Sequence, residues 1–325
     1  GRKPVLIASI SISMIFSAAC AFAPTITLLI TARAASAFGA GGMVAISTAL
    51  IKDSYEGKEM SKVLSVTQAF MLIAPMLAPV LGAIILKVAD WKMTFIVLAI
   101  LTGVSLVGTL LLQETLPVKE RTQSSTIQTI LGLRKVAKNP NFSSLLLVGA
   151  LIAAPFMAYL ALASYIYIDG FGVSETTFSM YFALNAGASI LGPVMYMRFG
   201  AGSVKKVISA GIMVAIISAV LILTIGNASP IIFLVSYVLY SIMTSYFRPL
   251  ISDLLLSATK TDVGAASSVM NFGFTVIGSI GMVVGSLQWS SYTGGLGITM
   301  LIFIGLTTIV WFYLLKARSI QFNWK

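Results

Sequence analysis

Long apolar stretches are the feature of this sequence that most restricts its fold. Runs of about 20 mostly apolar residues recur along the whole 325-residue chain, and each can cross a hydrocarbon core of ~30 Å as a helix. Only 10% of the residues are charged, against roughly 25% in a soluble domain. The shorter alternating segments of a membrane barrel are not visible. The sequence therefore predicts an all-α polytopic membrane protein.

Hydropathy divides the chain into ten predicted spans. The spans cover residues 4–22, 26–51, 62–86, 93–112, 142–168, 174–198, 204–226, 230–257, 262–287 and 292–315.

Basic residues are distributed unequally between the two sides of these spans. Of the 21 basic residues, Arg33 and Arg248 lie inside spans, Lys87 and Lys92 lie on one side, and the remaining seventeen lie on the other. Such a bias marks the basic side as cytoplasmic, so both ends of this chain are predicted to be cytoplasmic. Because these residues follow the topology, the net charge of +11 does not indicate nucleic-acid binding.

The chain also carries weak internal similarity. Residues 1–12 (GRKPVLIASISI) echo 202–213 (GSVKKVISAGIM), and residues 62–72 echo 264–274 at the start of a helix. The shared order of these echoes predicts two pseudo-repeat halves, as in many transporters.

Two spans, 142–168 and 174–198, have no counterpart in the first half. We therefore expect two further helices before Gly1, so that ten of twelve helices would be present here. The predicted organisation is an N-terminal bundle at 1–112, a cytoplasmic linker at 113–141 and a six-helix bundle at 142–325.

The predicted linker contains apolar residues that fall roughly on one helical face. They are Ile127, Ile130, Leu131, Leu133 and Val136. This segment is either a helix lying on anionic lipid headgroups or a plain hinge between the two bundles.

Several short motifs resemble those of a known family. Gly1-Arg2-Lys3-Pro4-Val5 looks like the tail of a cytoplasmic loop motif whose Asp-Arg-x-Gly-Arg-Lys core is cut off here. Arg33 to Ala40 resembles the motif of a fourth family helix, with Ser36 where glutamine is common. Residues 74–82 (APMLAPVLG) are similar to an antiporter motif and are the most specific match.

With Trp91-Lys92-x-x-Phe95 and Glu114-Thr115-Leu116, these motifs resemble the major facilitator superfamily over nearly the whole chain. Within it, the chain resembles the bicyclomycin/chloramphenicol-resistance branch of drug–proton antiporters. The major facilitator fold is therefore the expected architecture.

The resemblance implies proton-coupled efflux of small amphipathic drugs across a bacterial inner membrane by alternating access. It implies a monomer surrounded by lipid that is driven by the proton gradient and needs no cofactor, metal or nucleic acid. The proton-binding carboxylate is expected in the absent helices. The conformational motifs would comprise Gly1, Arg2, Lys3, Gly39, Pro75, Pro79 and Gly82.

Arg33 is the most unusual residue inside a span. A charge at the bilayer centre costs ~2.5–3.5 kcal/mol on insertion scales, so it normally faces a cavity or a partner. Because arginine does not deprotonate, Arg33 would hold or tune a carboxylate rather than carry the proton. The alternative is a structural ion pair with a residue of the absent helices.

Arg248 and Asp253 lie near the cytoplasmic end of the eighth predicted span. Their spacing of five residues is not that of helical neighbours. Snorkelling to the interface explains both side chains, and coupling to transport is the alternative.

Pro75 and Pro79 interrupt the third predicted span. Each removes a backbone donor and crowds the preceding turn, so a kink is expected there. Gly82 would permit close approach of a neighbouring helix, and the glycines at 39, 41, 42, 273, 278, 281 and 285 are interpreted in the same way.

A drug cavity needs apolar and aromatic walls with few polar anchors. The candidates within the predicted spans are Gln68, Met71, Phe156, Tyr159, Tyr165, Asn185, Asn271 and Phe272. For any one aromatic residue, core packing or contact with lipid is the alternative, whereas buried amides such as Asn185 and Gln68 need a polar partner.

Drug export is not the only function compatible with the sequence. Export of an endogenous metabolite fits the same fold, and a single saturable substrate would distinguish it. A membrane-embedded enzyme or receptor is disfavoured because the chain has no histidine and only one cysteine, Cys20, and shows no nucleophile–base arrangement. A channel is disfavoured because no filter repeat or ring of charges is visible.

Overall fold

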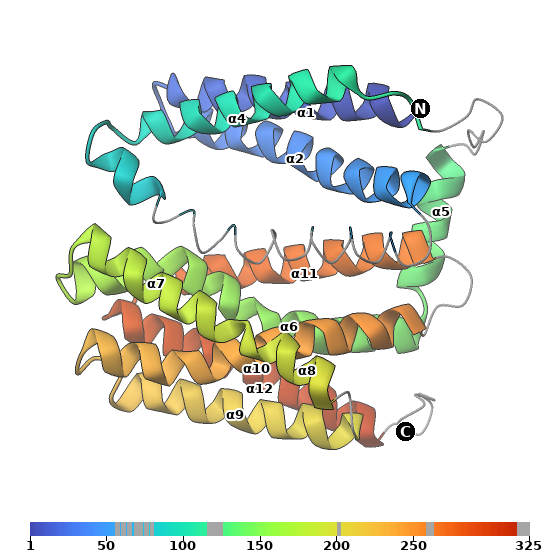
Figure 1. Cartoon of the computed structure of the whole chain (residues 1–325). Helices are drawn as coiled ribbons and strands as arrows, with labels where there is room; N and C mark the ends of the chain where they lie inside the picture. The colour runs from blue at the N-terminus through green and yellow to red at the C-terminus, as the bar shows by residue number, and fades with distance from the viewer. Residues whose placement is uncertain are drawn as a thin grey trace. The chain divides into compact units, whose positions relative to one another are not determined.

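The structure of the chain is a computed structural model, and it describes residues 1–55, 81–115, 126–199, 203–257 and 263–316, together with Glu59, Val63, Thr67, Ala74 and Ala78. All the regular elements in these residues are helices (Figure 1). The chain divides into two compact units, unit 1 at Gly1–Gln123 and unit 2 at Ser124–Lys325. The division falls inside the connection at 113–141.

Unit 1 is built around three helices. They are α1 (Arg2–Ala21), α2 (Ile26–Ser54) and α4 (Lys92–Leu111), with α1 packed against both of the others. The Thr25 side chain caps α2 by accepting a hydrogen bond from the Leu28 N–H, which satisfies one of the free donors of the first turn. Between α1 and α2, the hydroxyl groups of Ser17 and Ser36 lie 2.9 Å apart. A small polar contact thus joins two membrane helices, as is common where backbones approach closely.

Gly39 shows how close α1 and α2 are. A Cβ placed on Gly39 would lie 2.6 Å from both the Ser13 nitrogen and the Ser9 carbonyl oxygen, so no side chain fits there. The tight contact predicted for this glycine is therefore present. At Gly82, by contrast, no described atom lies within 4 Å of such a Cβ, so the predicted close approach is not seen in the described part of the chain.

Unit 2 begins with the linker helix α5 (Thr126–Ala137) and contains the remaining helices. These are α6 (Pro140–Ser164) with a π-helical end η2 (Tyr165–Gly170), α7 (Glu175–Ser189), α8 (Leu191–Phe199), α9 (Val204–Thr224), α10 (Pro230–Ser257), α11 (Val263–Gly285) and α12 (Tyr292–Lys316). Asn139 caps α6 through its side-chain oxygen, and Pro140 occupies the first turn, where its missing N–H costs nothing.

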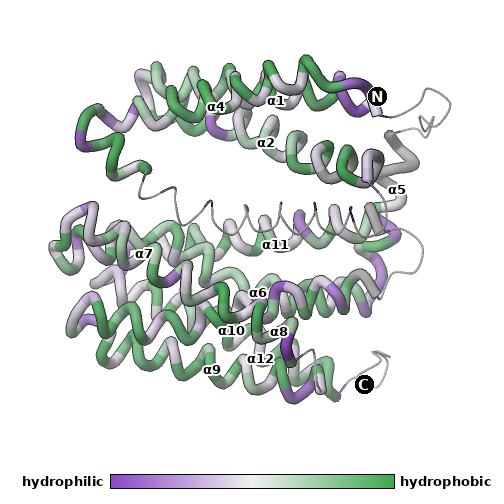
Figure 2. The backbone as a smooth tube through the Cα atoms, viewed as in Figure 1, coloured by the Kyte–Doolittle hydropathy of each residue, from purple (hydrophilic) through white to green (hydrophobic). Residues whose placement is uncertain are grey.

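Nine helices in the described ranges are long and apolar enough to cross a membrane. Figure 2 shows apolar residues along these helices and polar residues gathered towards their ends. They correspond to nine of the ten predicted spans. Most of the remaining span, 62–86, lies outside the described residues. The all-α membrane architecture expected from the sequence is thus confirmed for the part of the chain that the structure describes.

In the described part of the linker, residues Thr126–Ala137 form helix α5; the sequence had left a surface helix and a plain hinge as alternatives. Helix α5 packs against α6 and α11, with Val136 buried and Leu133 in contact with the unit 2 core. Its contact with lipid headgroups stays a prediction.

Helices α6 and α11 pack against each other through a row of glycines. A Cβ at Gly273, Gly278 or Gly285 would lie 2.8–2.9 Å from side-chain atoms of α6. At Gly281 it would overlap the backbone of Ala154, whose carbonyl carbon would be 2.9 Å away. These glycines therefore bring the two backbones together, as small residues commonly do in membranes.

The predicted span 174–198 is interrupted at Ile190, which separates α7 from α8. Pro193 has no N–H to donate to the Ser189 carbonyl four residues earlier. The Ser245 hydroxyl of α10 donates to that carbonyl instead, at 2.6 Å. Next to it, a Cβ at Gly192 would lie 2.5 Å from the Tyr246 nitrogen. The break is thus stabilised by a neighbouring helix, which hydropathy alone could not reveal.

We expect Ser245→Ala to lower the unfolding free energy of the protein by about 1 kcal/mol, because the Ser189 carbonyl then loses its donor inside the membrane. Ser252→Ala is the matched control, since among the described residues the Ser252 hydroxyl donates to the backbone carbonyl of Arg248 in its own helix. Denaturant titration of both variants in the same detergent checks this. Equal losses for the two serines would show that the contact across the break contributes nothing specific.

Unit 1 and unit 2 bury corresponding positions of their helices. Six of the seven buried residues of α1 become buried residues of α9 when 202 is added to each number. They are Leu6, Ser9, Ile10, Ser13, Ser17 and Cys20, which become Ile208, Gly211, Ile212, Ala215, Ala219 and Ile222, whereas Ala21 becomes the half-buried Leu223. The same shift takes the buried Thr102 and Thr109 of α4 to the buried Ile304 and Trp311 of α12. The burial pattern therefore aligns the two units with a shift of 202 residues, whereas the sequence similarity between 1–12 and 202–213 has a shift of 201.

Candidate functional site

Arg33 lies in the second turn of α2 and extends over a ring of α4. Its guanidinium carbon is 5.5 Å from the centre of the Phe95 ring, within the range of a cation–π contact. The Arg33 side chain is exposed within unit 1. Among the described residues, no hydrogen-bond acceptor or carboxylate contacts it. A permanent cation is therefore held in a membrane helix by an aromatic face.

This geometry restricts what Arg33 can do. Arginine presents five N–H donors in a planar fork that matches a carboxylate, and contact with a ring face does not consume them. The group can therefore bind an anionic ligand or hold a carboxylate in its charged form. This arrangement is compatible with both roles suggested for Arg33: holding or tuning a carboxylate during transport, and forming a structural ion pair.

The first residues of the chain contact the end of α4. The backbone N–H of Arg2 donates to Glu114 Oε1 at 2.8 Å, and Lys3 Nζ donates to the Leu110 carbonyl at 2.8 Å. A Cβ at Gly1 would overlap the Glu114 carboxylate, so glycine is the residue that fits there. The carboxylate also lies at the positive end of the α1 dipole, where a negative charge is stabilised. The two motifs that the sequence suggested separately thus form one cluster.

The interior of unit 2 contains a cluster of aromatic side chains. Tyr159 of α6 stacks on Tyr237 of α10 with ring centres 4.0 Å apart, and on Phe182 of α7 at 5.9 Å. Tyr159, Tyr167, Tyr237 and Tyr240 are all fully buried. Tyr159, predicted for a cavity wall, therefore has the core-packing position that was the alternative, and ligand contact by it stays a prediction.

Several polar atoms in this interior have no hydrogen-bond partner among the described residues. They are the hydroxyl groups of Tyr159, Tyr167, Tyr237, Ser241 and Thr244 and the side-chain oxygen of Asn185. Asn185 is only 3% exposed. Its burial agrees with the sequence analysis, whereas the polar partner expected for its oxygen is not seen. Tyr240 is satisfied, because its hydroxyl donates to the Ile152 carbonyl near Pro155.

At the other end of α10, Arg248 and Asp253 are both exposed. Asp253 accepts a hydrogen bond from the Tyr196 hydroxyl of α8. No ion pair joins Arg248 and Asp253 in the described structure, as their spacing of five residues suggested. Tyr196 was not identified from the sequence, because nothing in its local pattern shows that α8 meets α10.

The other predicted cavity residues are dispersed. Phe156 is half-buried and packs against the unit 2 core, while Asn271 is exposed on α11. Gln68, Met71, Pro75 and Pro79 lie outside the described residues. Within the described ranges, no three histidine, cysteine or acidic side chains gather where they could hold a metal ion.

A family model described as "Major Facilitator Superfamily" matches residues 1–282. The chain belongs to the major facilitator superfamily. This membership makes it a multi-pass membrane transporter and not an enzyme.

Its relatives agree with this assignment. The chain is 31% identical over 286 residues to the uncharacterized MFS-type transporter YdgK of Bacillus subtilis. This alignment covers 86% of this chain and 71% of that protein. It is 24% identical over 303 residues to the multidrug resistance protein MdtM of Escherichia coli O157:H7, over 91% of this chain and 72% of that protein. These bacterial relatives place the chain in an inner membrane.

A solved structure supports the fold. The D-xylose–proton symporter superposes with a TM-score of 0.70 at 13% sequence identity, covering all of this chain and 82% of that one. At this identity the likeness concerns the fold alone.

Proposed function

We propose that this major facilitator protein exports small amphipathic drugs in exchange for protons. Arg33 is the observation that carries the proposal. Because a cation in a membrane helix is costly, it is retained where it meets an ionised partner or substrate, and its donors face no described acceptor. An arginine whose donors are available can alternate between a carboxylate and a ligand as protons bind and leave.

The relatives support the same substrate class. The similarity to a multidrug resistance protein extends over 91% of this chain, and the motifs at residues 74–82 and 114–116 resemble those of bicyclomycin/chloramphenicol-type antiporters. Both ends of the chain would lie in the cytoplasm, because seventeen basic residues fall on that side. The protein would work as a monomer in lipid, without a cofactor, using the proton gradient as its energy source.

Alternating access supplies the mechanism. The two pseudo-repeat halves would rock about a midplane site, with the positive charge of Arg33 attracting a carboxylate until a proton or substrate displaces it. Export of an endogenous metabolite is the second candidate, and the similarity to YdgK, whose name states no substrate, is compatible with it.

Everted membrane vesicles containing the protein test the proposal. We expect a fluorescent amphipathic dye to be taken up when a proton gradient is imposed, and an uncoupler to abolish uptake. Vesicles without the protein are the control. Uptake that persists after the gradient collapses would contradict proton coupling, and saturation by one metabolite without competition from drugs would favour the second candidate.

A further inference from the structure

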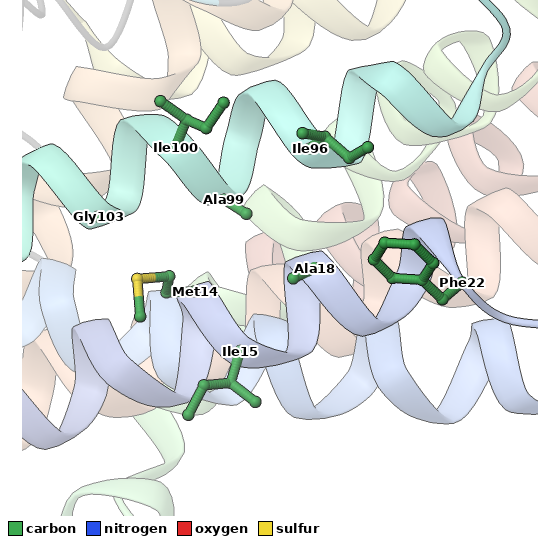
Figure 3. Close-up of a pocket in the computed structure, with 8 residues that line it drawn as sticks. All are labelled: Met14, Ile15, Ala18, Phe22, Ile96, Ala99, Ile100 and Gly103. Atoms are coloured by element: carbon green, nitrogen blue, oxygen red, sulfur yellow. The ribbon is translucent and has the colours of Figure 1, made fainter.

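An apolar groove runs between α1 and α4 in unit 1, with a volume of about 570 Å³. Met14, Ile15, Ala18 and Phe22 line one wall, and Ile96, Ala99, Ile100 and Gly103 line the other. Figure 3 shows Phe22 and Ile96 at one end and Met14 and Gly103 at the other. From Met14 to Phe22 the wall is roughly 12 Å long at 1.5 Å per residue, which fits within one leaflet of a ~30 Å core.

The corresponding face of unit 2 shows what this groove faces. Adding 202, the shift that superimposes the burial patterns of the two units, takes Ile15, Ile100 and Gly103 to Ile217, Ile302 and Gly305. All three of these are exposed. They are exposed even though unit 2 contains α6 and α7, which have no counterpart among the predicted spans of the first half. We therefore interpret this face as lipid-facing in both units.

Residue size explains why unit 1 has a groove on this face. Ala18 and Ala99 correspond to Val220 and Leu301 after the same shift. Ala18 has two side-chain carbons fewer than Val220, and Ala99 has three fewer than Leu301, which hollows the surface between the helices. Ile15, Phe22 and Ile100 lie at the edges of the groove with 58%, 76% and 59% of their surface exposed. The result is a narrow groove with apolar edges rather than a flat surface over the two helices.

One end of the groove is positively charged. Lys92 precedes Ile96 by one helical turn and lies on the same stripe of α4 as Ile96, Ala99 and Gly103. Lys87 lies in the turn just before, and both lysines are exposed. Asp90 is the nearby acidic residue, and its carboxylate accepts from the Lys92 backbone N–H.

The local charge balance at this end is positive. Two lysines outweigh Asp90, and the N-terminus of the 20-residue helix α4 adds further positive potential. Trp91 stacks edge-on against Phe95 at 5.9 Å, and tryptophan is enriched at the level of lipid headgroups.

We propose that the α1–α4 groove binds one acyl chain of an anionic phospholipid, with the headgroup held at the Lys92 end. The apolar walls accept the chain, and the two lysines recognise the phosphate and the net negative charge. The charge asymmetry of the connections predicts that this is the extracytoplasmic leaflet. The equivalent end of α12 in unit 2 lacks these charges, since the described residues 286–295 contain no lysine or arginine.

A second copy of the chain fits the groove less well than a lipid. In a two-fold dimer the same patch meets itself, so Lys87 and Lys92 would approach their own copies, and like charges in a partly desolvated contact repel. An anionic lipid meets the same lysines with opposite charge.

The test uses the purified chain and native mass spectrometry, with phosphatidylglycerol and phosphatidylcholine of matched acyl chains as probes. We expect the chain to retain phosphatidylglycerol preferentially. Gly103→Leu should reduce that retention several-fold by filling the groove. A Cβ at this position meets only the Met14 sulfur, at an ordinary 3.4 Å, so the variant should fold.

Two further variants separate chain and headgroup. Gly305→Leu, at the corresponding position of unit 2, should retain as much phosphatidylglycerol as the unmodified chain. Lys92→Gln should reduce the preference for phosphatidylglycerol over phosphatidylcholine by about fivefold, the expected contribution of one basic residue near an anionic lipid, without changing retention of phosphatidylcholine.

Three outcomes would overturn the proposal. Retention unchanged by Gly103→Leu would exclude the groove, and equal losses in the Gly103 and Gly305 variants would indicate unspecific annular lipid. A purified dimer that Gly103→Leu converts to monomers would assign the groove to a second copy. Circular dichroism and size-exclusion elution confirm that each variant is folded, and none of these measurements depends on transport.

Discussion

Replacing Arg33 with alanine should reduce proton-coupled export by roughly 100-fold, because the proposed pairing of its charge with a carboxylate or ligand would be lost. The variant should still insert, because removing a charge from a membrane helix makes insertion more favourable. The measurement is gradient-driven dye uptake in vesicles, normalised to the amount of inserted protein. The substitution removes two interactions of the guanidinium, its contact with the Phe95 ring and the proposed one with a carboxylate or ligand. Arg33 makes no hydrogen bond with the described residues.

Two control variants distinguish charge from packing. Arg33→Lys keeps the charge but loses the planar fork of donors, so partial activity is expected. Phe95→Leu removes the ring beneath the guanidinium and keeps an apolar side chain, so export should fall by less than in Arg33→Ala. Full export by correctly inserted Arg33→Ala protein would leave only the structural role for this residue.

Adding one methyl group at Gly281 should destabilise unit 2 by about 2–3 kcal/mol, the usual cost of overpacking a close contact. A Cβ at this position meets the backbone of Ala154, and backbone atoms cannot rotate away as a long side chain can. The measurement is the unfolding free energy of Gly281→Ala in detergent, from denaturant titration.

The matched control for Gly281 lies on the neighbouring helix α12. No described atom comes within 4 Å of a Cβ at Gly305, so Gly305→Ala should be neutral or stabilise by up to about 1 kcal/mol through helix propensity. If both variants unfold at the same denaturant concentration, the α6–α11 contact has enough slack to admit a methyl group.

Hydropathy predicted where the chain crosses the membrane but not how each helix is built. The segment 174–198 is apolar enough to be predicted as one span, so hydropathy alone does not reveal the break at Ile190. That break depends on Pro193 together with a donor from α10, and Ser245 is 56 residues away from Ser189 in sequence. The π-helical end of α6 at Tyr165–Gly170 was missed for the same reason, because hydropathy does not report the backbone hydrogen-bond pattern.

The candidate site was predicted unevenly for similar physical reasons. Arg33 stood out because a charge inside an apolar span is costly wherever it points. The contact of Glu114 with Arg2 could not be inferred, because it depends on helix ends 112 residues apart. Asn185 was correctly expected to be buried. Its neighbours on other helices could not be predicted, because that requires knowing which helix faces meet.

The glycine row between α6 and α11 determines how these helices respond to force. Attraction between two closely approaching backbones is dispersive and short-ranged, and a gap of 0.5–1 Å already forfeits roughly a quarter to a half of it. The contact is therefore stiff: it is either closed, with most of its energy, or open, with little. Spectroscopic labels placed on the outer faces of α6 and α11 should consequently report a distance between the helices that changes in one step, from the closed to the open contact.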